Sequence, residues 1–555
     1  MSVRNNVIPC EPLTTCQGKR DSRFCYGDLW MLDDPKHAYR LPLSVIALVD
    51  MNAFFAQVEQ VRLGLTTEDP VVCVQWNSLI AVSYAARKFG IGRMDNIQTA
   101  KQKCPGVILA HAAVFRKGNA YWAYYDGLPH QSNCKVSLDP YRREGRKIVK
   151  LFLKHCDVVE KSSVDESYLD LGRLVYNRMV HHFPQLARSE DKDRAMFLPP
   201  IPTVLPHELQ WQGEVVSTDT EENENEKFTL LSESQKGAGP TLSITDWDDV
   251  CMVVGSQVLY DLRKMIYDEL GYTTSGGLAN NKLVAKLAAG FKKPDFQTII
   301  RNRLANAFLS NFKLNDISGM GGKLGENVNE RLNLPSENQI AYIRDNFTLE
   351  DLKQEFKEDV PFALKLYEMV RGCHKKELTK RMEIKSMMST KNFTGKSPVK
   401  TLGDANDWIN VYAGDLYNRM IELDDESMNL SMVDPTKRMV TMVRRPKTLS
   451  VHVTTMTYST RSRQTQIPIC PSLDKLRDVL KTYATKTLIE VLSSVCDLSL
   501  LNGNRPLADI LQETNLNKIK ICELARMGIT ISNFVKSNGD RKSTRLNSSH
   551  ANISY

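Results

Sequence analysis

The chain has 555 residues, of which 42% are hydrophobic and 25% are charged, as in an ordinary globular protein of several domains. No apolar run approaches the roughly 20 residues of a membrane span, and no secretory signal is evident at the N-terminus. The net charge of +8 permits a polyanionic partner without requiring one, and the 12 scattered cysteines, which form no CxxC pair, indicate reduced intracellular thiols.

A strand that ends on an aspartate is the first clear pattern in the chain. Residues 1–40 lack a clear period and predict a loose leader with one short helix. The apolar run 45–49 then predicts a short strand buried on both faces. Asp50 ends this strand, and apolar residues recur at helical spacing from Phe54. Because an aspartate is rarely buried without a partner, Asp50 is either a turn or N-cap residue or a ligand for a cation.

A second acidic position lies more than a hundred residues further along the chain. The pattern around 158–170 predicts two strands joined near 161–163, with Asp165 and Glu166 at the tip. Neighbouring strand residues point to opposite faces, so these two carboxylates can serve one site only if the tip bends or bulges. An ordinary acidic hairpin is the alternative. Together with Asp50, the pair could hold two Mg²⁺ ions, which prefer oxygen ligands.

Two predicted helices carry cationic side chains. Tyr84 and Arg87 lie three apart in a predicted helix, 84–89, closed by Gly90. They suit a triphosphate, or else form a solvated arginine beside a core tyrosine. Lys282 and Lys286 share a face of a predicted helix, 281–289. Further elements are predicted as strands at 71–75, 80–83 and 272–278, helices at 96–103, 139–156 and 250–270, and a flexible surface insertion at 190–245.

The sequence pattern changes twice in the C-terminal half of the chain. Residues 301–384 predict an all-helical region, in which the Gly-rich turn 317–325 suits a helix-hairpin-helix that binds a DNA phosphate. A basic αβ module follows, and a Ser-, Asn- and Arg-rich tail begins after 535. The elements expected in the module are helices at 408–423 and 473–495 and strands at 438–443, 448–457 and 519–525.

The two acidic stretches, 49–59 and 163–166, resemble the metal-binding motifs of the Y-family translesion DNA polymerases. The likeness continues, in the same order, over roughly residues 40 to 530, in the segments 70–78, 81–91, 246–249, 271–275 and 385–389. It implies an α/β (α+β) multidomain fold of the right-hand polymerase type. The implied parts are a leader (1–40), a palm (41–52 and 100–300), short fingers (53–99), a helical thumb (301–384), an αβ little finger (385–537) and a disordered tail (538–555).

The resemblance also implies roles for single residues. Metal ligands would be Asp50, Asp165, Glu166 and the Met51 carbonyl, with Glu59 supporting the site. Nucleotide contacts would come from Phe54, Phe55, Tyr84, Arg87, Arg93 and Lys286. Within this set Phe55 would exclude a ribose 2′-OH, and Phe54 is as readily a core residue. Gln75 would contact the templating base.

The implied activity is template-directed DNA synthesis past bulky damage such as thymine dimers. It would use two Mg²⁺ ions, with low fidelity and no proofreading, in the nucleus. Partners would be primer-template DNA and dNTPs, with no membrane. The sliding clamp and ubiquitin are expected from the family, although their motifs are not found after residue 535. A two-metal nuclease and a non-catalytic DNA-binding scaffold are the competing hypotheses.

Overall fold

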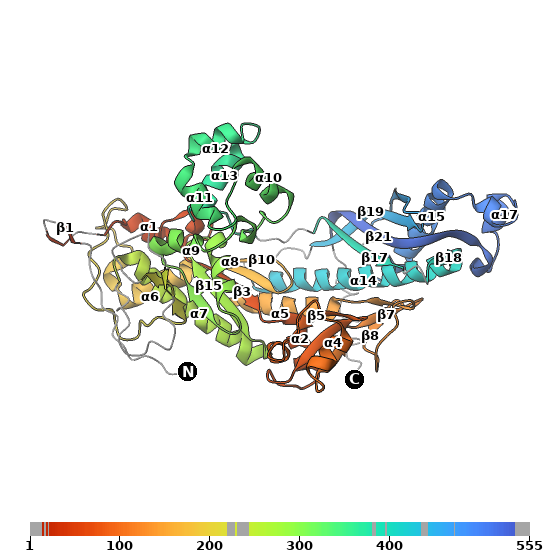
Figure 1. The fold of residues 1–555 in the computed structure, drawn as a ribbon, viewed down its shortest axis with the longest axis horizontal. Helices are drawn as coiled ribbons and strands as arrows, with labels where there is room; N and C mark the ends of the chain where they lie inside the picture. The colour runs from red at the N-terminus through yellow and green to blue at the C-terminus, as the bar shows by residue number, and fades with distance from the viewer. Residues whose placement is uncertain are drawn as a thin grey trace. The chain divides into compact units, whose positions relative to one another are not determined.

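The computed structural model describes residues 22–218, 244–379, 384–393, 397–433, 442–470 and 472–538, together with short strands at 14–15, 18–19 and 228–229. The chain divides into two compact units, and Figure 1 shows their elements. Unit 1 comprises Met1–Gly64 and Gly145–Arg381, and unit 2 comprises Leu65–Glu144 and Met382–Tyr555. Residues 53–64 of the predicted fingers fall in unit 1 and residues 100–144 of the predicted palm fall in unit 2, and the division into palm, fingers, thumb and little finger stays a prediction.

A six-stranded sheet is the centre of unit 1, with the strand order β10-β11-β3-β15-β16-β12. Strand β3 is antiparallel to both of its neighbours and is buried along its length apart from the partly exposed Asp50, as the apolar run predicted. The strands are β3 (Ile46–Met51), β10 (Val158–Lys161), β11 (Glu166–Asp170), β12 (Glu214–Val215), β15 (Thr274–Ala279) and β16 (Gln297–Ile299).

Two adjacent glycines in β15 let helices approach both faces of this sheet. A Cβ on Gly276 would lie 3.0 Å from a Leu259 methyl of α7 (Trp247–Leu270). A Cβ on Gly277 would lie 2.0 Å from the carbonyl oxygen of Ala285 in α8 (Lys282–Phe291). Neighbouring strand residues face opposite sides, so the sheet lies between α7 and α8. The other long helices of unit 1 are α2 (Phe54–Arg62) and α6 (Gly172–His182), and α5 (Asp139–His155) begins in unit 2 and ends in unit 1.

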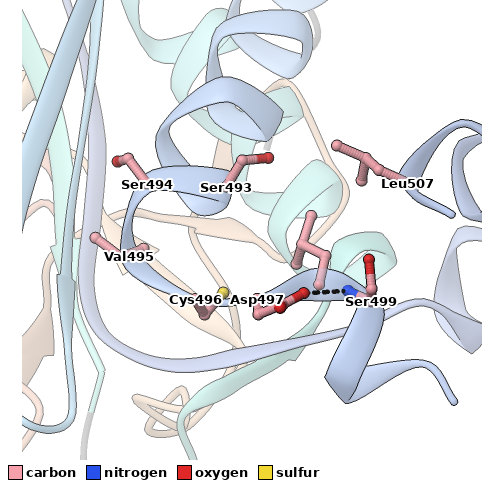
Figure 2. A pocket seen from close by; sticks show the side chains of 8 residues that line it. Ser493, Ser494, Val495, Cys496, Asp497, Ser499 and Leu507 are labelled. Carbon is pink, nitrogen blue, oxygen red and sulfur yellow. Dashed lines mark hydrogen bonds between the residues drawn. The ribbon is translucent and has the colours of Figure 1, made fainter. Parts of the chain in front are cut away.

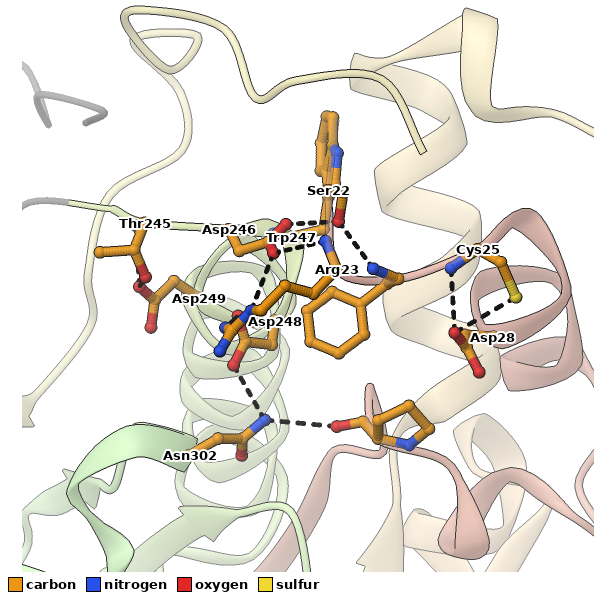
Figure 3. Close-up of polar contacts among 12 residues, drawn as sticks. Ser22, Arg23, Cys25, Asp28, Thr245, Asp246, Trp247, Asp248, Asp249 and Asn302 are labelled. Atoms are coloured by element: carbon orange, nitrogen blue, oxygen red, sulfur yellow. Dashed lines mark hydrogen bonds and ion pairs between the residues drawn. The ribbon is translucent and has the colours of Figure 1, made fainter. Parts of the chain in front are cut away.

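The segment 22–40 is packed against unit 1, so the expectation of a loose leader is wrong for these residues. The expected short helix is α1 (Tyr26–Trp30), and Leu29 and Leu32 are fully buried. Ahead of α1, the hydroxyl of Ser22, the backbone N–H of Arg23 and the Arg23 guanidinium all donate to the Asp246 carboxylate, at 2.5, 3.0 and 3.2 Å (Figure 3). Because Asp246 is also the N-cap of α7, this contact ties the segment to that helix.

The predicted insertion 190–245 is only partly as expected. Up to residue 218 the segment is attached to unit 1, since Leu198 and Leu209 are buried and the indole of Trp247 donates to the Pro199 carbonyl oxygen at 2.7 Å. Strand β12 then joins the edge of the sheet. The acidic run 219–227 lies outside the described residues.

Residues 301–379 are helical, as predicted, around a core that includes the buried Phe308, Leu352 and Leu366. The Gly-rich turn leads into a helix at Lys323, and a Cβ on Gly325 would lie 1.8 Å from the Met320 carbonyl oxygen, which explains that glycine. The helices are α9 (Ala305–Leu309), α10 (Lys323–Arg331), α11 (Gln339–Asn346), α12 (Leu349–Glu355) and α13 (Val360–Val370).

The described residues of unit 2 form three sheets. Two are small, with the strand orders β5-β4-β6 and β8-β7-β9, and the third has the order β17-β21-β19-β20, with β18 beside β21. The two small sheets and the helices between their strands are β4 (Val71–Gln75), β5 (Ser78–Val82), α3 (Tyr84–Arg87), α4 (Ile97–Lys103), β6 (Ile108–His111), β7 (Val114–Arg116), β8 (Trp122–Ala123) and β9 (Cys134–Val136). The predicted strand 71–75 and helix 96–103 are confirmed. The predicted strand 80–83 begins two residues earlier, at Ser78.

The large sheet of unit 2 departs from the prediction in its strands. Strand β19 continues through the basic residues 444–447, and β17 and β20 had no predicted counterpart. The predicted helices 408–423 and 473–495 are confirmed as α14 and α15. The elements are β17 (Ser386–Asn392), β18 (Val399–Thr401), α14 (Leu402–Val433), β19 (Met442–Thr455), β20 (Thr460–Gln466), α15 (Leu476–Val495), α16 (Leu498–Leu501), α17 (Leu507–Leu511) and β21 (Lys520–Asn538). The tail 539–555 lies outside the described residues.

Within the described part of the chain, no helix is long and apolar enough to cross a membrane. The ten cysteines described there are free thiols.

Candidate active site

The two acidic stretches meet in the sheet of unit 1. Asp50 lies opposite Glu166 in the antiparallel pairing of β3 with β11. The N–H of Met51 donates to the backbone oxygen of Asp165 at 2.9 Å. The ladder therefore brings residues that are far apart in sequence to one end of two adjacent strands.

The tip before β11 bends, as one shared site requires. Residues 163–165 form a bend, and β11 starts only at Glu166. The hydroxyl of Ser163 accepts the backbone N–H groups of Asp165 and Glu166 at 3.2 and 3.0 Å, and it donates to the Asp165 carboxylate at 2.5 Å. Ser163 thus holds the turn that releases Asp165 from the alternation of a regular strand.

Burial and neighbouring negative charges disfavour the ionised form of Asp50. Burial raises the pKa of Asp50 to about 6, with the negative charges of Glu166 and Asp165 adding to the effect and the Lys293 ammonium opposing it. Lys293 Nζ lies 2.8 Å from Asp50, and Lys286 Nζ lies 2.7 and 2.9 Å from the two oxygens of Glu166. Two lysines therefore supply the positive charge that these acids need.

The side-chain positions bear directly on metal binding. Among the residues that the structure describes, no three His, Cys, Asp or Glu side chains are grouped so that they could hold a metal ion. In this arrangement Lys293 holds Asp50 and Lys286 holds Glu166. The oxygen donors are of the type that Mg²⁺ takes, and the negative charges of Glu166 and Asp165 add to the burial that raises the pKa of Asp50. The residues present fit a divalent cation once these two carboxylates turn from lysine to the ion.

A hydrogen-bond network fixes the turn between β3 and α2. The Asn52 side chain accepts from the Ser275 hydroxyl at 2.7 Å, and the Gln57 side-chain oxygen accepts the N–H of Thr273 at 2.9 Å. The Gln57 amide in turn donates to the backbone oxygen of Asn52. Ala53, at φ 45°, occupies the left-handed turn that this network encloses. These polar residues and Lys293 were not among the predicted site residues, and the one sequence feature that marks Lys293 is its place in the basic pair before Pro294.

Helix α2 presents the predicted Phe54, Phe55 and Glu59. Phe54 is buried with its ring 6.0 Å from that of Tyr272, which favours its role as a core residue. Phe55 is only partly buried. Glu59 is fully buried and pairs with Arg62 at 2.7 Å. The structure gives Glu59 this ion pair, and its support of a metal site stays a prediction.

Helix α8 carries both predicted lysines on one face, as expected. Asn281 caps its N-terminus by accepting from the N–H of Val284. Lys282 is buried and binds both oxygens of Glu160 at 2.7 Å, and Lys286, one turn later, binds Glu166. Lys282 is therefore a structural residue, whereas the partly exposed Lys286 reaches the acidic cluster.

The other predicted nucleotide contacts belong to unit 2. The guanidinium of Arg87 lies 4.2 Å from the ring centroid of Tyr84, and its Nε donates to the Val82 oxygen at 3.1 Å. Gln75 ends β4 and is partly buried, and Arg93 is exposed in a turn. The structure thus confirms the pairing of Tyr84 with Arg87. Convergence of these residues with the carboxylates of unit 1 stays a prediction.

Comparison with known proteins finds one matching family and several similar proteins. Residues 49–290 match the impB/mucB/samB family. The chain is 38% identical to DNA polymerase eta of Saccharomyces cerevisiae over 486 residues, 79% of this chain and 71% of that protein. It is 32% identical to N-acetyltransferase eso1 of Schizosaccharomyces pombe over 81% of this chain, and 27% identical to DNA polymerase eta of Drosophila melanogaster over 68%. It spans 46% and 40% of the length of these last two proteins.

Proposed function

We propose, because this chain belongs to the impB/mucB/samB family of Y-family DNA polymerases, that it copies template DNA past bulky damage such as thymine dimers. The predicted resemblance to the Y-family polymerases is confirmed by the match to the yeast enzyme. The proposed activity is that of a DNA-directed DNA polymerase acting on nuclear DNA, with primer-template DNA and dNTPs as substrates. Low fidelity, the absence of proofreading, and recruitment by a sliding clamp or ubiquitin stay predictions from the family.

Membership of this family implies dependence on a divalent metal. Asp50, Asp165 and Glu166 would hold two Mg²⁺ ions, with the Met51 carbonyl as a further oxygen ligand. Bound there, the ions would lower the pKa of the attacking hydroxyl and stabilise charge on the phosphates. Support comes from the pairing of Asp50 with Glu166, from the bend that frees Asp165, and from the raised pKa of Asp50. The meeting of these acidic residues at one end of β3 and β11 is the single observation that carries the proposal.

The lysines of the cluster have a second role in this proposal. In the structure Lys286 neutralises Glu166, and an incoming triphosphate would offer it stronger acceptors. Lys286 would then bind the nucleotide's phosphates, and the family resemblance gives Tyr84 and Arg87 the same role. Fixed cations at this place would stabilise the negative charge that develops as pyrophosphate leaves.

The side chains around the nucleotide would set its selection. Phe55, partly exposed at the start of α2, would lie against the sugar and exclude a ribose 2′-OH. The side chain of Arg93 is exposed, and its planar guanidinium would stack on the incoming base. Gln75 would contact the templating base. These three roles come from the family and rest on the exposure of the side chains.

Primer extension tests the proposal. Wild-type protein with Mg²⁺ and dNTPs should extend a primer on an undamaged template and opposite a thymine dimer. Asp165→Ala should abolish extension on both templates while it leaves primer-template binding within about twofold of wild type, whereas the surface control Asp261→Ala should change neither. Degradation of the primer without extension would favour a two-metal nuclease, and binding without either reaction would favour a scaffold.

A further inference from the structure

The turn between β4 and β5 in unit 2 has an unusual backbone conformation. Two residues, Trp76 and Asn77, join Gln75 at the end of β4 to Ser78 at the start of β5. Trp76 has a φ of 59°, in the left-handed region that bulky side chains rarely occupy. In two-residue turns this position usually holds glycine or asparagine. Strain of this kind persists only where the surroundings impose it, so contacts from the rest of unit 2 must hold Trp76 in place.

His111 holds the backbone of Trp76. The N–H of Trp76 donates to His111 Nε2 at 3.1 Å, and His111 Nδ1 donates to the backbone oxygen of Ala112 at 2.7 Å. These two bonds together require a neutral imidazole with its proton on Nδ1. The centroids of the Trp76 and His111 rings lie 5.3 Å apart. Because His111 ends β6, the strand beside β4, the small sheet itself supports the turn.

Lys391 contacts the indole of Trp76 from the large sheet. It lies in β17 and is only 7% exposed. Its Nζ donates to the backbone oxygens of Gln131 and Cys134 at 2.7 and 2.9 Å, and it lies 5.6 Å from the ring centroid of Trp76. Two further rings complete the surroundings of the ammonium, at 5.0 and 5.7 Å: Trp408 and Phe393. An ammonium removed from water is attracted to aromatic faces at such distances, so Lys391 attaches the turn to the large sheet.

We propose that Lys391 is a positioning residue for the template: through Trp76 it fixes the turn from which Gln75 contacts the templating base. This inference rests on the proposed function, in which Gln75 has that role. Gln75 directly precedes Trp76 and is only partly buried. If Trp76 relaxed into an ordinary backbone region, the turn would change its course and Gln75 would move with it. Because Lys391 is buried, it acts through the indole and not by binding a phosphate.

A double-mutant cycle on single-nucleotide insertion by the full chain tests this proposal. Gln75→Ala and Lys391→Met should each lower kcat/KM for the correct dNTP on an undamaged template by about tenfold. The double variant should be no more than about twofold worse than Gln75→Ala, because both changes remove the same contact. Effects that multiply to about a hundredfold, or a single variant without effect, would overturn the proposal.

Binding of primer-template DNA separates positioning from DNA contact. The Kd of Lys391→Met should stay within about twofold of wild type, and a Kd about tenfold weaker would overturn the proposal, because it would make this lysine a DNA contact. A wild-type chain that inserts no nucleotide would refute the proposed function and this inference with it.

Further variants show whether the effect belongs to the turn. Trp76→Ala should reproduce the loss seen in Lys391→Met and gives the same readout if that variant does not fold, whereas Trp76→Phe keeps an aromatic face and should retain most of the activity. Lys117→Met breaks an ion pair with Asp404 of α14 and leaves the turn unchanged, so its kcat/KM should stay within about twofold of wild type. Ser493 lies on the wall of a hollow of about 420 Å³ at the end of α15 (Figure 2), and Ser493→Ala should likewise behave as wild type. A loss in either control as large as in Lys391→Met would overturn the proposal, because it would show that packing of unit 2 in general sets the rate.

Discussion

Replacing Asp50 by asparagine should stabilise the metal-free protein while it abolishes nucleotide incorporation. In the structure the pKa of Asp50 stands at about 6 instead of 3.8, mainly through burial and then through the charges of Glu166 and Asp165. One pKa unit corresponds to about 1.4 kcal/mol, so keeping Asp50 ionised at pH 7 costs about 3 kcal/mol of folding free energy. Asparagine has the same shape without the charge but loses the ion pair with Lys293. A net gain of about 1–3 kcal/mol is expected.

The sign of this effect depends on pH. Because the pKa of Asp50 is raised in the folded protein, the folded state binds more protons between pH 3.8 and 6, and the cost of ionisation is fully present only above pH 6. The stability advantage of Asp50→Asn should therefore be largest at pH 7 and nearly vanish at pH 4. Mg²⁺ should stabilise wild-type protein more than the variant, because it offsets the same repulsion.

Thermal unfolding without metal, at pH 4, 5, 6 and 7, measures this difference. The expected advantage at pH 7 is about 2–6 °C in Tm. The surface variant Asp261→Asn, whose carboxylate is 56% exposed and pairs with Arg178, is the matched control and should show no such pH dependence. A variant that is less stable than wild type at pH 7, or equally advantaged at all four pH values, would refute the reasoning.

Three further substitutions test contacts that stabilise the fold. Lys282→Met should lower the free energy of unfolding by about 3–5 kcal/mol in urea titrations, because it leaves the buried Glu160 without its ammonium partner; a loss below about 1 kcal/mol would contradict this. Gly277→Ala should cost more than about 2 kcal/mol in the same assay, since the new Cβ would lie 2.0 Å from the Ala285 oxygen, and wild-type stability would show that α8 can move away. Burial lowers the pKa of Lys391 to about 8, so the unfolded chain binds more protons between pH 8 and 10.5; wild-type stability should rise with pH there relative to Lys391→Met, and parallel curves would argue against it.

The sequence predicted the centre of unit 1 well because its signals are local and strong. The apolar run before Asp50 is the pattern of a strand buried on both faces, and it became β3. Asn281 followed by an apolar-periodic run with Lys282 and Lys286 became a capped helix with both lysines on one face. In these segments propensity, capping and hydrophobic period agree with each other.

The prediction failed where long-range contacts decide the structure. Residues 22–40 lack a period of their own, and their order comes from distant contacts such as the one between Ser22 and Asp246. Lys391 lies in the segment that the sequence indicates only as a basic αβ module. In the structure it is buried, and its Nζ donates to the Gln131 and Cys134 oxygens and lies 5.0 Å from the Trp408 ring centroid. Neither arrangement has a signal in the adjacent sequence.

The sequence predicted the carboxylates of the acidic cluster but not the lysines that pair with them, and the role of the cluster as a metal site stays a prediction. Asp50, Asp165 and Glu166 lie in recognisable motifs, and strand pairing brings them together. Lys293 follows α8, and its ion pair with Asp50 depends on a chain path that the sequence pattern does not encode.

Counting bound metal ions tests the central claim most directly. Mn²⁺, which takes the same oxygen ligands as Mg²⁺, can be titrated by electron paramagnetic resonance into a complex of the protein with primer-template DNA and a non-hydrolysable dNTP. Two tightly held ions per chain are expected for wild-type protein, and Asp165→Ala should lose at least one of them while Asp261→Ala retains both. Equal ion counts in wild type and Asp165→Ala would contradict the assignment of these carboxylates to the metals.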